Sequence, residues 1–215
     1  LGYLLEAEIH LANRSMAPAI EAMKASLARS KSTAQAIRLE AMLTSAKRQP
    51  EAAQFAASWL KEHPRDLAFL AHLGATSLAA RDYPTAEVRY RAALAVAPND
   101  ATILNNVAWL MIEQGKRGAL ALATAANEQA PGRPAIMQTL AAALKAEGRL
   151  PDALQWQRRA VANSDNAPAQ RLSLAKLLLE SGDRTAAKQE LQALAQLGSA
   201  FKDQAEVATL LRDLS

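Results

Sequence analysis

Three histidines are the side chains of this 215-residue sequence best suited to general-base or metal chemistry. His10 lies four residues after Glu6, so one helix face could present both as half of a metal site. No His-Glu-x-x-His motif completes that site, and a surface pair is the simpler interpretation. His63 precedes Pro64 at an expected helix end, where a partly charged imidazole suits the helix dipole. His72 is expected on the rim of its helix, without an adjacent nucleophile pattern.

Other catalytic patterns are missing from the sequence. It has no cysteine, which excludes disulfides, thiolate metal sites and a cysteine nucleophile. Its eight glycines form no Gly-x-Ser-x-Gly and no dinucleotide- or phosphate-binding loop. The carboxylates are expected at scattered solvent-facing positions, with no apolar pocket to shift a pKa. We therefore predict no enzymatic activity, no cofactor and no metal ion.

The charge pattern favours a solvated helical surface. The chain carries 25 basic and 21 acidic residues, a formal net charge of +4, and the two signs are mixed along it. A nucleic-acid interface needs basic residues clustered on one face, so we expect no nucleic-acid partner. No run of about 18 apolar residues occurs, and we expect no direct membrane insertion by this segment.

Short amphipathic helices must position these side chains. Half of the residues are hydrophobic, and the dominant alanine and leucine are good helix formers. Residues 67–100 show the pattern most clearly, with two amphipathic helices joined by a polar turn at 81–83 and closed by Pro98. One such helix pair cannot bury its own apolar faces and needs neighbours of the same kind.

Several markers recur in a common register. The second-helix alanine recurs at intervals of 34, 33, 34 and 34 residues, and the closing proline at intervals of 34 and 33. The fourth repeat is one residue shorter than its neighbours, with the missing residue after Gly115-Lys116, and this explains the intervals of 33. Independent markers with one period favour a helical repeat over a non-repetitive bundle. They are Pro64, Pro98 and Pro131; Ala52, Ala86, Ala119, Ala153 and Ala187; and the turn glycines Gly115, Gly148 and Gly182.

The register predicts an all-α fold, a single solenoid over residues 1–215 in which antiparallel helix pairs stack into a right-handed superhelix. A last helix at about 203–214 is expected to cap it. The chain begins at Leu1 without methionine, so we expect a fragment of a longer chain, with a possible lipid anchor upstream. The expected repeats span about 1–32, 33–66, 67–100, 101–133, 134–167 and 168–201.

The whole chain resembles the tetratricopeptide-repeat superfamily, most clearly at Leu73-Gly74, Ala86, Tyr90, Ala93 and Pro98. A narrower resemblance runs from Phe55 to Pro131 and includes Trp-Leu-x-x-His-Pro and Leu104-Asn-Asn-Val-Ala-Trp109. These motifs, and the carboxyl end, are similar to repeat-containing lipoproteins of bacterial exosortase (PEP-CTERM) and exopolysaccharide systems. The resemblance implies a protein of the periplasm or outer membrane; a cytoplasmic location is the alternative.

In this superfamily the first helix of each pair lines a concave groove, and the resemblance implies one here. Its second, fifth, ninth and twelfth positions form one stripe. Such a groove can accept an extended segment or a helix of a protein or peptide partner. Trp109, beside Asn105, has the character of a binding hot spot, unless its ring only packs over Ala142. The predicted groove residues are Ala71, Ala75, Thr102, Asn105, Trp109, Ile112, Gln138, Ala142, Lys145, Leu172 and Lys176.

Three functions are compatible with this pattern. The first is a non-catalytic interaction scaffold in a bacterial envelope system for exopolysaccharide or protein sorting. The second is a regulatory or substrate-presenting region of a larger enzyme such as a glycosyltransferase. The third is a cytoplasmic self-assembling scaffold. Fold alone does not decide between them.

Overall fold

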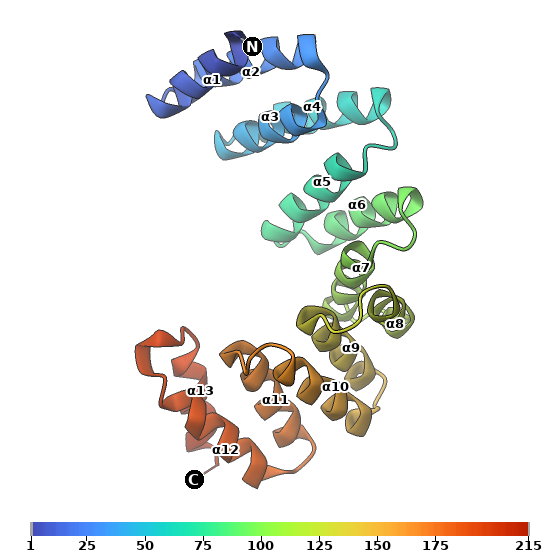
Figure 1. Ribbon diagram of the computed structural model, residues 1–215, viewed down its shortest axis with the longest axis vertical. Helices are drawn as coiled ribbons and strands as arrows, with labels where there is room; N and C mark the ends of the chain where they lie inside the picture. Colours follow the sequence, from blue (N-terminus) through green and yellow to red (C-terminus); the bar gives the residue numbers. More distant parts are fainter. Residues whose placement is uncertain (1, 215) are drawn as a thin grey trace. The chain divides into compact units, whose positions relative to one another are not determined.

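Short helices account for nearly all of the chain (Figure 1). The structure, a computed structural model, describes residues 2–214, which form thirteen α-helices and one short 3-10 turn, Gly198–Ala200. Consecutive helices pack as antiparallel pairs, so the predicted all-α fold is confirmed. No helix within residues 2–214 combines the length and apolarity needed to cross a bilayer. The helices are α1 Gly2–Ala12, α2 Met16–Ser30, α3 Thr33–Ser45, α4 Gln49–Glu62, α5 Leu67–Ala79, α6 Tyr83–Val96, α7 Ala101–Glu113, α8 Ala119–Gln129, α9 Pro134–Ala146, α10 Leu150–Ala162, α11 Pro168–Glu180, α12 Arg184–Ala195 and α13 Gln204–Arg212.

The turn inside each helix pair requires a left-handed backbone conformation. In the last three pairs the residue with positive φ is glycine, at Gly115, Gly148 and Gly182, where the absent Cβ makes this conformation inexpensive. In the second pair Lys47 takes this position with φ 59°, and Arg14 and Arg81 take it in the first and third pairs. The turn geometry is therefore common to all six pairs, although only half of them carry the residue best suited to it.

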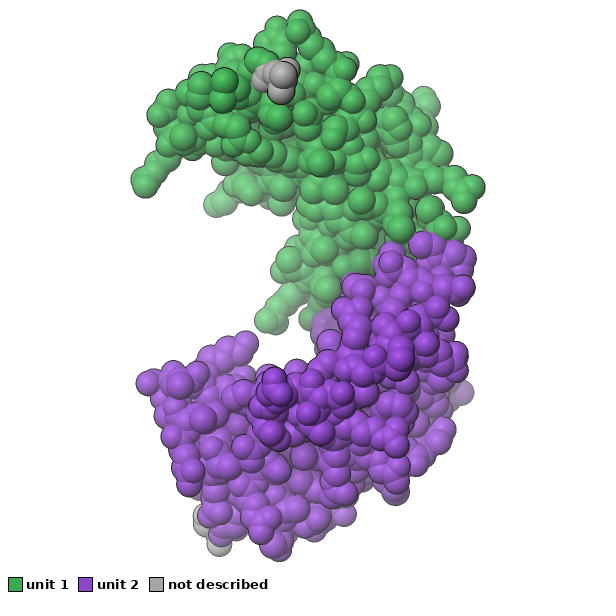
Figure 2. All heavy atoms as spheres, viewed as in Figure 1, with its two compact units in different colours: residues 1–96 green, residues 97–215 purple. Residues whose placement is uncertain are grey.

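The chain divides into two compact units, residues 1–96 and 97–215 (Figure 2). Unit 1 contains α1 to α6, and unit 2 contains α7 to α13. The single continuous solenoid expected over residues 1–215 stays a prediction.

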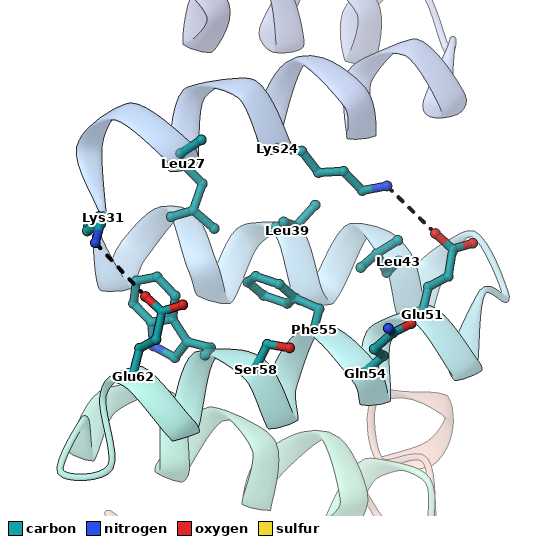
Figure 3. Close-up of a pocket in the computed structure, with 12 residues that line it drawn as sticks. Lys24, Leu27, Lys31, Leu39, Leu43, Glu51, Gln54, Phe55, Ser58 and Glu62 are labelled. Carbon is teal, nitrogen blue, oxygen red and sulfur yellow. Dashed lines mark ion pairs between the residues drawn. The ribbon is translucent and has the colours of Figure 1, made fainter.

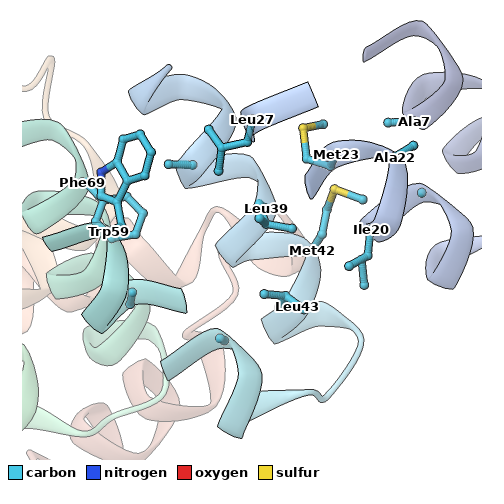
Figure 4. Packing of buried hydrophobic residues seen from close by; sticks show 14 of the residues in the cluster. Ala7, Ile20, Ala22, Met23, Leu27, Leu39, Met42, Leu43, Trp59 and Phe69 are labelled. Carbon is cyan, nitrogen blue, oxygen red and sulfur yellow. The ribbon is translucent and has the colours of Figure 1, made fainter. Parts of the chain in front are cut away.

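The core of unit 1 spans its first five helices (Figure 4). Its largest fully buried side chains include Ile20, Met23, Leu39, Leu43 and Phe69. Alanines fill the positions where two helices approach most closely. In the third pair the contact is closer still, because a Cβ added to Gly74 would lie 2.8 Å from the ring of Tyr90. The Leu-Gly step of this repeat thus accommodates the aromatic residue of its second helix.

The core of unit 2 continues to the end of the described chain. Leu191 and Leu194 of α12 pack with Phe201 and with Val207 of α13, and all four are buried. The last helix therefore covers apolar residues of α11 and α12, as expected for a capping helix. The second helix of the fourth pair begins at Ala119, directly after Gly118, which adopts φ 90°.

Asp66 joins three helices of unit 1. Its carboxylate accepts a hydrogen bond from the backbone N–H of Phe69 at 3.1 Å and so caps α5. It also accepts from the Thr33 hydroxyl of α3 at 2.8 Å and from the Trp59 indole N–H of α4 at 2.9 Å. Asp100 of unit 2, by comparison, caps α7 through the backbone N–H groups of Thr102 and Ile103.

Replacing Asp66 with alanine is expected to lower the free energy of unfolding by about 2–4 kcal/mol, because the loss of a cap adds to the loss of a partner for a buried indole. The matched substitution Asp100→Ala removes only a cap and is expected to cost about 1 kcal/mol. Chemical denaturation of both variants measures the difference. Equal losses would show that the link between α3, α4 and α5 adds nothing to the cap.

Candidate functional site

The predicted groove residues are divided between the two units. Ala71 and Ala75 lie on α5 of unit 1, where Ala71 is half-buried and Ala75 is exposed. The other nine lie on α7, α9 and α11 of unit 2. The structure can therefore bring together a site within unit 2, and the proximity of α5 to α7 remains a prediction.

Four of the predicted residues line one hollow between α9 and α11. Gln138, Ala142 and Lys145 lie on α9, and Lys176 lies on α11, around a space of about 200 Å³. The amide of Gln138 donates a hydrogen bond to the hydroxyl of Ser173 at 2.9 Å and connects the two helices across the hollow. Alanine at position 142 leaves room at the centre of this surface.

Both lysines at this hollow are paired with carboxylates. The ammonium of Lys145 lies 2.6 Å from Glu180, and that of Lys176 lies 2.6 Å from Glu206 of α13. The positive charge of the two lysines is therefore neutralised locally. Each of the four side chains is between two fifths and half exposed, so each pair contributes only about 0–1 kcal/mol and can exchange partners.

Leu172 does not belong to the accessible surface. Only 4% of it is exposed, and it packs in the core with Leu191, Leu194 and residues of the C-terminal segment. The expectation that it lines the groove is wrong, because the carboxyl-terminal segment covers this part of α11. The hydrophobic period of α11 alone could not show which apolar residues this segment would cover.

The predicted residues on α7 do not share one environment. Thr102 is exposed and accepts a hydrogen bond from Arg133 at 3.0 Å. The side-chain oxygen of Asn105 is buried, and among the described residues no hydrogen-bond donor reaches it. Ile112 lines a separate hollow of about 490 Å³ near the shortened turn. Trp109 is half-buried, and its projection into a groove stays a prediction.

The histidines show one interaction that the sequence analysis missed. His72 is mostly covered, not on a rim, and its Nε2 lies 2.6 Å from a carboxylate oxygen of Glu40 on α3. The Glu40 side chain is 6% exposed and accepts a second hydrogen bond from Thr44 at 3.0 Å. Glu87 is also buried, so the expectation that all carboxylates face solvent is wrong. The repeat register indicates the burial of Glu40, because Glu40 occupies the position that carries a small residue, such as Gly74, in the other repeats.

The pair of Glu40 and His72 has a defined electrostatic consequence. Burial alone would raise the pKa of the Glu40 carboxyl, but hydrogen bonds from His72 and Thr44 and the charge of His72 lower it more. The pKa of this carboxyl is therefore held below its ordinary value of 4.5. No group of three His, Asp or Glu side chains within residues 2–214 is placed to hold a metal ion. His10 lies 3.9 Å from Glu6 in a partly exposed pair.

The model of the tetratricopeptide-repeat family matches residues 21–199 of this chain. No curated protein sequence matches this chain. The matched segment covers most of both units and every predicted groove residue.

Solved structures with the same fold have low sequence identity to the chain. PilW, a widely conserved type IV pilus biogenesis factor, superposes with a TM-score of 0.73 at 16% identity, covering 96% of each chain. MamA from Desulfovibrio magneticus RS-1 gives a TM-score of 0.68 at 15% identity, covering 78% of this chain and 95% of MamA. YrrB, described as having an unusual peptide-binding site, gives 0.67 at 14% identity, covering 88% and 99% of the two chains. These similarities establish the fold.

The Glu40→Gln substitution is expected to lower the free energy of unfolding by about 1–2 kcal/mol at about pH 5.5. The folded-state pKa of Glu40 is lowered, so the stabilisation from its charge is complete above 4.5 and is lost as the pH falls through the folded-state value. The difference from the unsubstituted protein should therefore shrink as the pH falls below 4.5.

Denaturant unfolding over this pH range measures the effect, and Glu113→Gln, at an exposed position of α7, is the control. A difference that does not change with pH would show that the Glu40 charge is not stabilising.

Proposed function

The chain belongs to the tetratricopeptide-repeat family, and we propose that it is a non-catalytic scaffold that binds a segment of a partner protein on the α9–α11 surface of unit 2. The hollow beside Ala142 is the observation that supports this proposal most directly. It combines an open space with an amide, a hydroxyl and two exchangeable ion pairs, so a partner segment would meet several hydrogen-bonding groups there.

The polar groups of this surface match the needs of an extended segment. Gln138 and Ser173 can exchange their mutual hydrogen bond for bonds to a partner backbone. Lys145 and Lys176 can donate to carboxylates of the partner in place of Glu180 and Glu206. Trp109 of α7 would supply the aromatic anchor that small polar contacts lack.

The cellular setting is a second part of the proposal. The resemblance of residues 55–131 to exosortase-associated lipoproteins supports a scaffold in the bacterial envelope, serving exopolysaccharide or protein sorting. PilW, a pilus biogenesis factor, has the same fold. Cell fractionation of the source bacterium tests this location, and recovery of the full-length product only from the cytoplasm would contradict it. The full reading frame would reveal an attached enzyme domain if the chain is instead a regulatory region.

Substitution of Ala142 by arginine is expected to fill the hollow and block binding while leaving the core intact. Peptides selected from a random-peptide phage library against the unsubstituted protein are the probe. Their affinity, measured by calorimetry, should fall at least about tenfold for Ala142→Arg and for Trp109→Ala. Ala121→Arg, at an exposed position of α8 outside the hollow, should bind unchanged.

Two outcomes would contradict the site. Either no peptide is enriched, or the enriched peptides bind Ala142→Arg as tightly as the unsubstituted protein. Thermal melting of each variant separates binding from folding. A large loss of stability in Trp109→Ala would assign this ring to packing between repeats.

A further inference from the structure

A second surface, in unit 1, has different chemistry. A slot of about 570 Å³ lies between α2 and α4, with α3 behind it (Figure 3). Its lining is mainly apolar and comes from all three helices: Leu27 from α2, Leu39 and Leu43 from α3, and Phe55 and Trp59 from α4. Volumes of this size are typical of sites that enclose a ligand or a group of anchoring side chains.

The slot is bordered by two aromatic residues with fixed positions. Trp59 takes a repeat position that carries alanine at 93, 126 and 160. Its indole N–H is held by Asp66 at 2.9 Å, and its ring lies 6.3 Å from that of Phe55 and 5.9 Å from that of Phe69. Its position is therefore set before any partner arrives, and rigid aromatic anchors in apolar pockets are the usual centres of binding energy.

Opposite charges border the two sides of the slot. The α2 side carries Lys24 and Lys31, and the α4 side carries Glu51 and Glu62 (Figure 3). Lys24 faces Glu51 at 3.7 Å across one end, and Lys31 faces Glu62 at 4.0 Å across the other. The slot thus has a basic rim, an apolar floor and an acidic rim.

The ion pairs across the slot are easily exchanged. Glu51 is held mainly by Arg48 at 2.5 Å, and Lys24 lies closer to Glu21, at 2.9 Å, than to Glu51. The hydrogen bond from Arg48 lowers the pKa of Glu51, which keeps this rim charged. Lys31 and Glu62 are 69% and 65% exposed, so their mutual attraction is weak. A partner can therefore replace both contacts at little cost.

We propose that this slot binds an amphipathic α-helix of a partner protein, with its acidic edge along α2, its apolar stripe in the slot and its basic edge along α4. Lys24 lies on α2 and Lys31 directly follows its last residue, so the two are seven residues apart along the chain, a rise of about 10 Å. Carboxylates at positions i and i+7 of a docked helix match this separation. A strand presents only two faces, whereas a helix can present an acidic edge, an apolar stripe and a basic edge together.

The proposal differs from that for the α9–α11 surface in position and in ligand. The slot lies wholly within unit 1 and has leucine and aromatic side chains at its floor, whereas most of the side chains that line the hollow of unit 2 are polar or charged. Loss of binding at one surface leaves the other unaffected, so the two tests fail independently.

The probe is a synthetic helical peptide of about 18 residues with a leucine stripe, glutamates on one edge and lysines on the other. A second peptide of identical composition has the two edges exchanged. Isothermal titration calorimetry with the full chain should show binding of the first peptide and roughly fivefold weaker binding of the second. Ser58→Arg, which fills the slot, should abolish binding, whereas the neighbouring exposed Ala57→Arg should not.

A double variant tests the charge order directly. Exchange of charges in Lys31→Glu with Glu62→Lys alters two exposed side chains, so folding is unaffected and the preference between the two peptides should disappear. No binding of the first peptide at millimolar concentration would overturn the proposal, as would equal affinity for both peptides or unchanged binding to Ser58→Arg. Binding of lauric acid that competes with the peptide and exceeds it in affinity would assign the slot to an apolar small molecule. Dimerisation of the protein that is lost in Ser58→Arg would assign it to a second copy.

Discussion

The close approach of helices at small residues is the constraint on which this structure depends. The second helix of every pair carries an alanine at the same register position, and each is at most 5% exposed: Ala19, Ala52, Ala86, Ala119, Ala153 and Ala187. A larger side chain there would separate the helices, because packed interiors have no spare volume. Gly74 shows how tight this limit is, since even a Cβ at that position would overlap Tyr90.

Departures from this rule coincide with the chemically distinctive sites of unit 1. Glu40 occupies a position that is otherwise Gly or Ala, and its burial is compatible with stability because His72 and Thr44 satisfy the carboxylate. Trp59 occupies a position where alanine is common, and an apolar slot lies beside it. Substitution within a repeat thus produces a buried glutamate–histidine contact in one place and an apolar slot in another.

The two proposed recognition surfaces, one in each unit, differ in the side chains that line them. In unit 2, polar side chains of α9 and α11 meet across a small hollow, and their charges are paired with neighbours. In unit 1, an apolar floor is bordered by a basic and an acidic rim. A scaffold with two surfaces of unlike chemistry can bind two partners without competition, which would raise the effective concentration of one partner near the other.

The sequence alone determined the repeat, because alanine, proline and turn glycine positions report directly on close packing and on positive φ. The family resemblance and helix periodicity together also placed Gln138, Ala142, Lys145 and Lys176 in one set, and all four line the hollow between α9 and α11. Tertiary structure decided which side chains remain accessible. Leu172 is covered by the C-terminal segment, and Glu40 meets His72 of a different helix pair. Such contacts join residues about thirty positions apart. The periodicity within one helix does not show which side chain of another helix each residue will contact.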